Sequence, residues 1–278
     1  MMKSRKALGV IAAAAFSVAG AQMASAGIIT QWAFGTTAVP SPVNSPAPTT
    51  GSGTAVSLGM TNNYTYAGGE GPGSVSNDDI TVPGSTPEAA WRIRGNSNTK
   101  NSGPGLANGW NNSAPNYTQG AEFVESTAGF NNLNLSFDWF DTTQGVGNMQ
   151  IQYTLDASNA SPTWINVGAD FVAPGNTFFS STTPNISVSI PAGGSDFAVQ
   201  MVSVRPVLGD ANFAAFAAGD TSGGLDYANA AGADYNNSSG NWSFNNITIS
   251  GTAVPEPTSA SLLGLAGLGL LRRRRTAK

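Results

Sequence analysis

Apolar side chains in this chain recur at every second residue, which is the pattern of a half-buried β-strand. Leu133, Leu135, Phe137 and Trp139 alternate with polar residues, so one face of this segment is apolar and the other is polar. The same period marks residues 149–155, 186–190 and 197–201. Between residues 27 and 254, no apolar pattern keeps a helical spacing over a dozen residues. The pattern therefore predicts that residues 27–254, here called the body, form β-strands.

Turn residues divide these strands and favour one architecture. Clusters rich in Gly, Pro and Asn stand at residues 173–176 and 191–194, and such clusters are typical of turns. Short strands separated by turns predict an all-β antiparallel β-sandwich or jelly roll over residues 27–253. Residues 211–240 are rich in Ala and show little alternation. We interpret them as an extended loop with one helical turn.

The last apolar segment of the body changes phase. Trp242 and Phe244 lie in one phase, whereas Ile247 and Ile249 lie in the other. One additional residue in a strand produces such a change. The intervening Asn-Asn pair therefore predicts a β-bulge.

Residues 1–26 are typical of a secretory signal peptide. Three basic residues lie within the first six, and residues 7–21 are almost wholly small or apolar. Ala24 and Ala26 then supply the small residues that signal peptidase requires. The alternative, an N-terminal core helix, needs a polar face that this run lacks. We expect cleavage before Gly27 and export of the mature chain.

Residues 254–278 contain three parts in a fixed order. Pro255, Glu256 and Pro257 come first, an apolar run over residues 260–271 follows, and the chain then has a basic cluster. The cluster consists of Arg272, Arg273, Arg274 and Arg275. The apolar run makes about 18 Å of helix at ~1.5 Å per residue, which is short for a bilayer span. Arginines beside such a run favour the cytoplasmic side of the membrane.

This order closely resembles the PEP-CTERM sorting signal of Gram-negative and related bacteria. The resemblance implies that the tail anchors the precursor transiently in the inner membrane and that the membrane enzyme exosortase processes it. The mature protein is then expected at the cell surface or in the extracellular matrix. The alternative is a plain C-terminal anchor, which differs mainly in that the tail is kept.

The body is also similar to a family of exported bacterial β-sandwich domains found upstream of PEP-CTERM tails. The similarity rests on Gln31-Trp32-Ala33-Phe34 and on residues 51–55, 122–130, 133–139, 150–156 and 242–251. These motifs are structural, so the similarity implies a fold and no catalytic residue. Their order indicates that the first and last strands lie near one another and that the tail leaves directly after the last strand.

Composition excludes several kinds of chemistry. The chain has no Cys and no His, which excludes disulfides, thiol nucleophiles, Ser-His-Asp triads and the usual zinc or haem ligands. Between residues 27 and 254, four basic residues face fifteen carboxylates. An acidic body repels phosphate backbones, so we expect no nucleic-acid partner.

Two carboxylate pairs are the candidates for chemistry. Asp138 and Asp141 bracket Trp139-Phe140 at the end of the strongest strand, and Asp78 and Asp79 are adjacent. Such pairs serve glycosidases at separations of ~5 to 10 Å. They also bind calcium, which takes 6 to 8 oxygen ligands. The third interpretation is that they cap turns or face solvent. Structural calcium is the only cofactor that the sequence suggests.

Five aromatic residues in polar surroundings are candidates for stacking on sugars or for packing on a sheet. They are Tyr64, Tyr66, Trp91, Trp110 and Tyr117. From these patterns we expect a non-enzymatic protein of the cell envelope or extracellular matrix that associates with exopolysaccharide or other matrix components. The alternative is a secreted carbohydrate-active hydrolase that uses the paired carboxylates.

Overall fold

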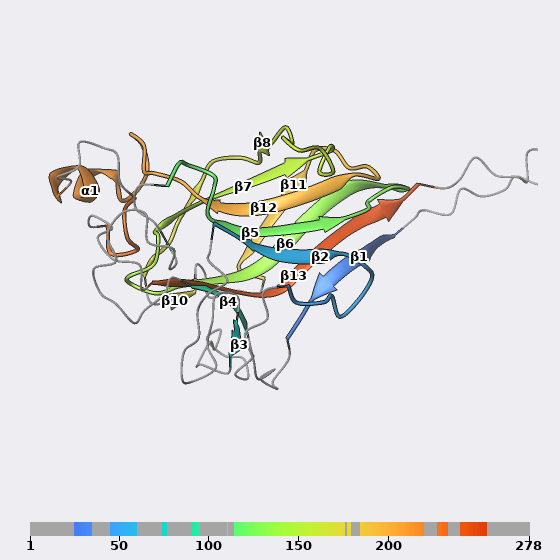
Figure 1. Cartoon of the computed structure of the whole chain (residues 1–278), viewed down its shortest axis with the longest axis horizontal. Coiled ribbons are helices and arrows are strands. Elements are labelled where there is room, and N and C mark those ends of the chain that lie inside the picture. Colours follow the sequence, from blue (N-terminus) through green and yellow to red (C-terminus); the bar gives the residue numbers. More distant parts are fainter. Residues whose placement is uncertain are drawn as a thin grey trace, which may run out of the picture.

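In the computed structural model of the chain, two antiparallel sheets pack face to face as a β-sandwich (Figure 1). The structure describes residues 25–34, 45–59, 74–76, 90–94, 110, 114–175, 177–178, 184–219, 227–232 and 240–254. The sandwich prediction is thus confirmed for the body. The expected signal peptide up to Ala24 and the tail from Pro255 onward lie outside the described residues.

The first sheet has seven strands and the second has six. The seven-stranded sheet contains β1 (Ala26–Trp32), β3 (Ser74–Ser76), β4 (Ala90–Arg94), β6 (Phe130–Asp141), β10 (Thr177–Phe178), β11 (Ile186–Ile190) and β13 (Asn241–Ala253). The six-stranded sheet contains β2 (Thr54–Leu58), β5 (Gly120–Glu125), β7 (Asn148–Thr154), β8 (Ile165–Asn166), β9 (Phe171–Val172) and β12 (Phe197–Ser203).

The last strand, β13, lies in the interior of the seven-stranded sheet. One edge of it pairs with β6, while its other edge pairs with β4 near the start and with β1 near the end. The register against β6 shifts between Asn245 and Thr248, and Asn246 has a φ of 52°. The predicted bulge at Asn245 and Asn246 is therefore confirmed. It lets Phe244 and Ile247 both face the core, where each is fully buried.

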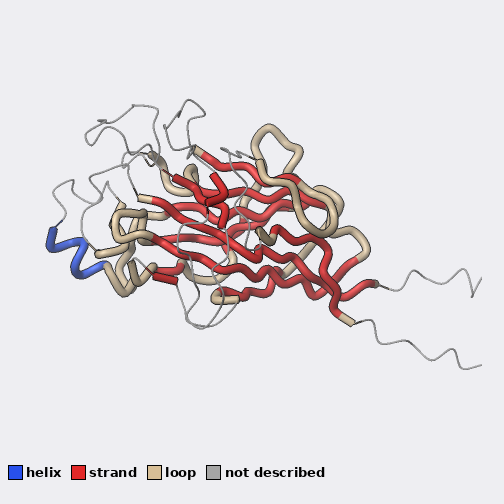
Figure 2. Tube along the Cα trace, turned by 90° about the horizontal axis from the view of Figure 1, so that it is seen from below, coloured by secondary structure: helices blue, strands red, loops and turns tan. Residues whose placement is uncertain are grey.

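Strands β1 and β13 bring the two ends of the body together. In their antiparallel register, Ala26 pairs with Thr252 and Gly27 pairs with Gly251. The start of the blue strand and the end of the red strand lie side by side at the right of Figure 1, and the second view agrees (Figure 2). The prediction that the first and last strands are neighbours is confirmed.

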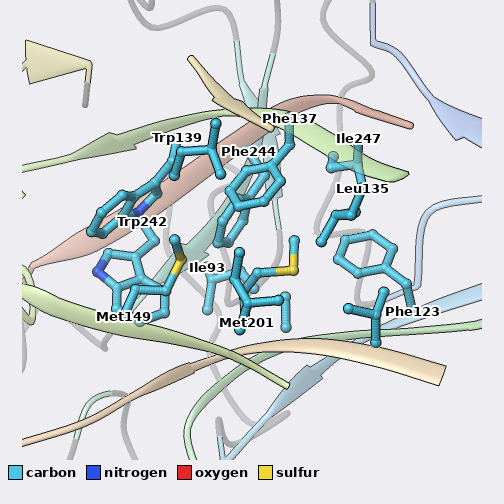
Figure 3. Close-up of a cluster of buried hydrophobic side chains, with 14 of the residues drawn as sticks. Ile93, Phe123, Leu135, Phe137, Trp139, Met149, Met201, Trp242, Phe244 and Ile247 are labelled. Carbon is cyan, nitrogen blue, oxygen red and sulfur yellow. The ribbon is translucent and has the colours of Figure 1, made fainter. Parts of the chain in front are cut away.

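Alternating residues of both sheets fill the core (Figure 3). The predicted inward row Leu133, Leu135, Phe137 and Trp139 is buried. The inward-facing apolar residues of β7 and β12 are buried as well. Leu155 departs from the prediction with 43% of its surface exposed, because β7 ends one residue earlier.

Two glycines let the chain cross from β1 to β2. Gly51 has a φ of +77°, and a Cβ there would lie 2.2 Å from the carbonyl oxygen of Ile29. Gly53 has a φ of +152°, and its Cβ would lie 2.9 Å from the carbonyl oxygen of Val124. Both positions combine a close backbone approach with a backbone conformation that favours glycine. Residues 51–55 are one of the segments that are similar to the exported β-sandwich family, and the two glycines of this segment therefore have a structural role.

The described part of residues 211–240 includes one short helix, α1 (Phe213–Gly219), which is longer than the single turn expected. It lies at the opposite end of the sandwich from the start of β1 (Figure 1). Among the residues that the structure describes, no helix is long and apolar enough to cross a membrane. The apolar run at residues 260–271 is not among them.

Candidate functional site

The structure places Asp138 and Asp141 on opposite faces of β6. Residues 138–141 pair with β13 one for one, from Asp138 with Asn245 to Asp141 with Trp242, so odd and even residues face opposite ways. Asp141 follows the inward row that ends in Trp139, whereas Asp138 belongs to the outward row. Both are buried, each with 1% of its surface exposed. The two carboxylates therefore do not converge on one point.

Asp138 holds two neighbouring strands in place. Its Oδ1 accepts a hydrogen bond from the backbone N–H of Asn185 at 3.0 Å, directly before β11. Its Oδ2 accepts another from Nδ2 of Asn246 in the bulge, also at 3.0 Å. The amide of Asn185 in turn bonds both backbone groups of Trp139. Because β11 pairs with β6 only up to Phe137 and β10 only from Phe140, this network fills the break between them and gives Asp138 a structural role.

Asp141 is enclosed at the end of the inward row. A Cβ on Gly145 would lie only 1.7 Å from its Oδ1, so the turn that follows β6 passes directly over the carboxyl. The nearby indole N–H of Trp242 donates to the carbonyl of Val146 at 2.7 Å. Burial disfavours the charged form of this carboxyl, and interactions with the Trp242 indole and with the backbone N–H of Thr142 offset that effect only in part. Burial therefore raises the pKa of Asp141 well above its ordinary value.

These positions remove the basis for a shared site at Asp138 and Asp141. Carboxylates on opposite faces of one strand cannot flank the same glycosidic bond, nor can they bind the same ion. Among the described residues, no group of three or more acidic side chains is placed to hold a metal ion. Asp78 and Asp79 lie outside the described residues. Calcium binding stays a prediction.

A second inward-facing carboxyl lies near the other end of the core. Glu125 continues the row of Ala121 and Phe123 on β5, and 6% of its surface is exposed. Neither of its carboxylate oxygens has a hydrogen-bond partner among the described residues. Burial raises the pKa of Glu125 to about 8. In the sequence, the only signal of this buried carboxyl was that Glu125 occupies the same phase as Ala121 and Phe123 in an alternating segment.

The structure does not bring the five candidate aromatic residues together at one site. Trp91 and Trp110 are buried in the core. Trp110 packs against Trp242 at 4.6 Å between ring centroids, and its Nε1 donates to the carbonyl of Gly240 at 2.9 Å. Tyr117 is exposed, whereas Tyr64 and Tyr66 lie outside the described residues. For the two tryptophans, the packing interpretation is confirmed.

Polar side chains form a row across the outer face of the six-stranded sheet. Register places Glu122, Gln200, Gln152 and Asn166 side by side on β5, β12, β7 and β8. Gln200 donates to Gln152 at 2.6 Å, and Gln152 donates to Asn166 at 2.7 Å. The two glutamines are buried, while Asn166 is exposed and Glu122 is half-buried. Polar groups of this row are therefore accessible mainly at its two ends.

Another polar cluster joins two loops to the start of β7 near α1, where no sequence motif marks it. The fully buried Asn148 donates from Nδ2 to Asp170 at 2.8 Å and to Asp210 at 3.2 Å. Its Oδ1 accepts a hydrogen bond from Asn212 at 2.6 Å. Burial raises the pKa of Asp210, and the charge of Asp170 adds to this effect. The cluster ties the loops after β8 and β12 to the start of β7.

The sorting residues that the structure describes lie at one end of the sandwich. Ala26 and Gly27 begin β1, and β13 ends at Ala253, two residues before Pro255. The next residue, Val254, donates its backbone N–H to the carbonyl of Gly129 at 2.8 Å. The segments expected at both chain ends therefore attach to the same end of the body. Ala24, the Pro-Glu-Pro motif and the four arginines lie outside the described residues.

No protein-family model matches this chain, and no curated protein shows significant similarity to it. Among solved structures, it is similar to the N-terminal endo-1,4-beta-D-xylanase 10B of Clostridium thermocellum, in its CBM22-1 and GH10 modules complexed with xylohexaose. That match has a TM-score of 0.30 and 11% sequence identity, and it covers 63% of this chain and 24% of that chain. At this distance, the similarity assigns neither a family nor an activity to this chain.

Proposed function

We propose that this chain is an exported protein of the cell envelope or extracellular matrix whose C-terminal tail is removed by exosortase. The observation that carries the proposal is the pairing of β1 with β13. This pairing closes the sheet between the expected signal-peptide junction and the expected sorting tail. Removal of both end segments costs this body only the pair between Ala26 and Thr252, because the register from Gly27 and Gly251 onward is kept.

We further propose that the body acts by association with polysaccharide or other matrix components, without catalysis. The rival hydrolase depended on Asp138 and Asp141 as a catalytic pair, and their placement on opposite faces of β6 does not support it. A glycan panel read separately for binding and for hydrolysis tests both proposals. Binding without hydrolysis supports association, whereas hydrolysis that survives Asp138→Asn and Asp141→Asn points to other catalytic groups.

Mature protein from the exporting host should begin at Gly27. Cleavage after Ala26 removes only the first residue of β1 and leaves the pair between Gly27 and Gly251 in place. Because signal peptidase requires small residues at the cleavage site, Ala26→Phe should prevent cleavage there. Mass spectrometry of the N-terminal peptide measures the result. A start beyond Ile28 would contradict the prediction, since it would shorten the strand that pairs with β13.

The tail should be removed near Pro255-Glu256-Pro257 in a host with exosortase and retained in a host without it. Replacing these three residues with alanine should trap the protein in the membrane fraction with Arg272 to Arg275 still attached. Ending the chain at Val254 should release the protein in both hosts. Intact mass and membrane fractionation provide the measurement. If mature protein from the exosortase-containing host still carries the arginines, the plain-anchor alternative replaces the sorting proposal.

A further inference from the structure

The end of β13 is hydrogen-bonded to the body up to the residue before the Pro-Glu-Pro motif. Thr252 pairs with Asn131 of β6 on one edge, and on the other edge it pairs with Ala26, the residue that cleavage before Gly27 removes. Ala253 pairs with Phe130. Val254 then donates its N–H to the carbonyl of Gly129. The folded body therefore leaves no unpaired residue between this strand and Pro255.

The other side of the motif is also short. Only residues 255–259 separate Val254 from the apolar run that begins at residue 260. Five fully extended residues span at most about 18 Å at ~3.6 Å per residue. An enzyme that acts on an anchored precursor must therefore reach a segment held between the folded body and the membrane.

A cleaving enzyme needs an extended substrate on both sides of the bond that it attacks. The residues before Pro255 meet this need only when they leave the sheet. In an exported chain that begins at Gly27, Thr252 and Ala253 still pair with β6, Val254 still bonds Gly129, and Gly251 still pairs with Gly27 of β1. Folded proteins open locally, and cleavage that depends on opening follows the population of the open form.

We propose that the folded body restricts processing of its own tail, so that cleavage at the Pro-Glu-Pro motif requires the last pairs of β13 to be open. This inference rests on the proposed function and concerns the regulation of that same site. The strand occupies the interior of its sheet and is the last part of the body to leave the ribosome and the export channel. Tail removal is therefore fastest before β13 has joined β1 and β6, and slow afterwards.

The test measures tail removal by pulse-chase in an exosortase-containing host, using the full chain. A flexible Gly-Ser insertion of eight residues between Val254 and Pro255 separates the motif from the folded body and leaves β13 unchanged. We expect it to accelerate tail removal about tenfold, because access no longer depends on local opening. The matched control places the same insertion between Ala160 and Ser161, which are both exposed in the loop after β7, and should leave the rate unchanged.

A second variant opens the strand without lengthening the chain. Thr252→Pro removes a backbone N–H from the paired end of β13 and should also accelerate tail removal. The inference is overturned if both variants are processed at the wild-type rate or more slowly while wild-type protein is processed. In that case the sorting proposal still stands. If no chain loses its tail in this host, the sorting proposal itself fails.

Discussion

Replacing Trp242 with alanine should lower the free energy of unfolding of the mature protein by about 3–5 kcal/mol. Trp242 is fully buried and has three aromatic neighbours, Trp110, Trp139 and Phe244, with ring centroids at 4.6, 5.5 and 6.1 Å. Truncation leaves a cavity among rings that come from separate segments of the chain, and such rings cannot easily collapse into it. Denaturant unfolding followed by far-ultraviolet circular dichroism measures the loss.

Two further variants separate packing from hydrogen bonding. Trp242→Phe keeps an aromatic ring but leaves the buried carbonyl of Val146 without its donor, which should cost about 1–3 kcal/mol. Leu208→Ala is the surface control and should change stability by less than about 0.5 kcal/mol. An unfolding midpoint for Trp242→Ala equal to that of wild type would show that the ring is not in the core.

The stability of the mature protein should fall between about pH 4.5 and pH 8 through the ionisation of Glu125. The pKa of Glu125 is raised from 4.5 to about 8 in the folded protein because the side chain is buried. Between these two values the folded state binds one proton more than the unfolded state, so stability decreases as pH rises. The contribution is fully present below pH 4.5 and is lost as pH rises through the folded pKa. The total loss is on the order of 5 kcal/mol.

The variant Glu125→Gln isolates this effect because glutamine has a similar shape and does not ionise. Below pH 4.5, wild type and variant should have nearly equal stability. The variant should become progressively more stable than wild type up to about pH 8 and keep a constant advantage above it. Subtracting the two curves cancels other buried carboxyls, such as Asp141, whose pKa values are also raised. A difference that does not change with pH would contradict a buried, ionisable Glu125.

The surroundings of Glu125 explain why the carboxyl stays neutral. A Cβ on Gly53 would lie 3.3 Å from the Cβ of Glu125 and 3.2 Å from the ring of Trp32. On β12, Phe197 is the register partner of Glu125. Chain elements packed around this carboxyl thus contribute apolar groups, and the described residues supply no hydrogen bond to its oxygens. A protonated carboxyl is less costly to bury there than a charged one.

The carboxylates of β6 show what sequence reasoning could have excluded. Asp138 and Asp141 are close in sequence, which suggested a common site, but an odd separation within a regular strand places side chains on opposite faces. The same alternation that predicted the inward-facing row therefore already indicated that Asp138 and Asp141 do not share a site. Which partners Asp138 has could not be predicted, since Asn185 and Asn246 lie 47 and 108 residues away.

The two tryptophans Trp91 and Trp110 show a limit of a different kind. Trp110 is followed by two asparagines, and Trp91 lies between Ala90 and Arg92, so the local pattern left both packing and ligand contact open. Trp91 packs edge-on against Phe123 with ring centroids at 5.7 Å, and Trp110 packs against Trp242. These contacts exist only because strands distant in sequence are stacked in the sandwich.

By itself, the sequence of this protein determined which residues alternate, where the last strand bulges, and which short segments mark the two expected sorting signals. All of these are local patterns, because side-chain direction in a strand follows from the backbone of a few adjacent residues. Only the tertiary structure decided that Ala26 pairs with Thr252, that Glu125 is enclosed with no hydrogen-bond partner among the described residues, and that Asn148 links Asp170 to Asp210. Each of these depends on which distant strands and loops become neighbours, and burial and pKa follow from those neighbours rather than from adjacent residues.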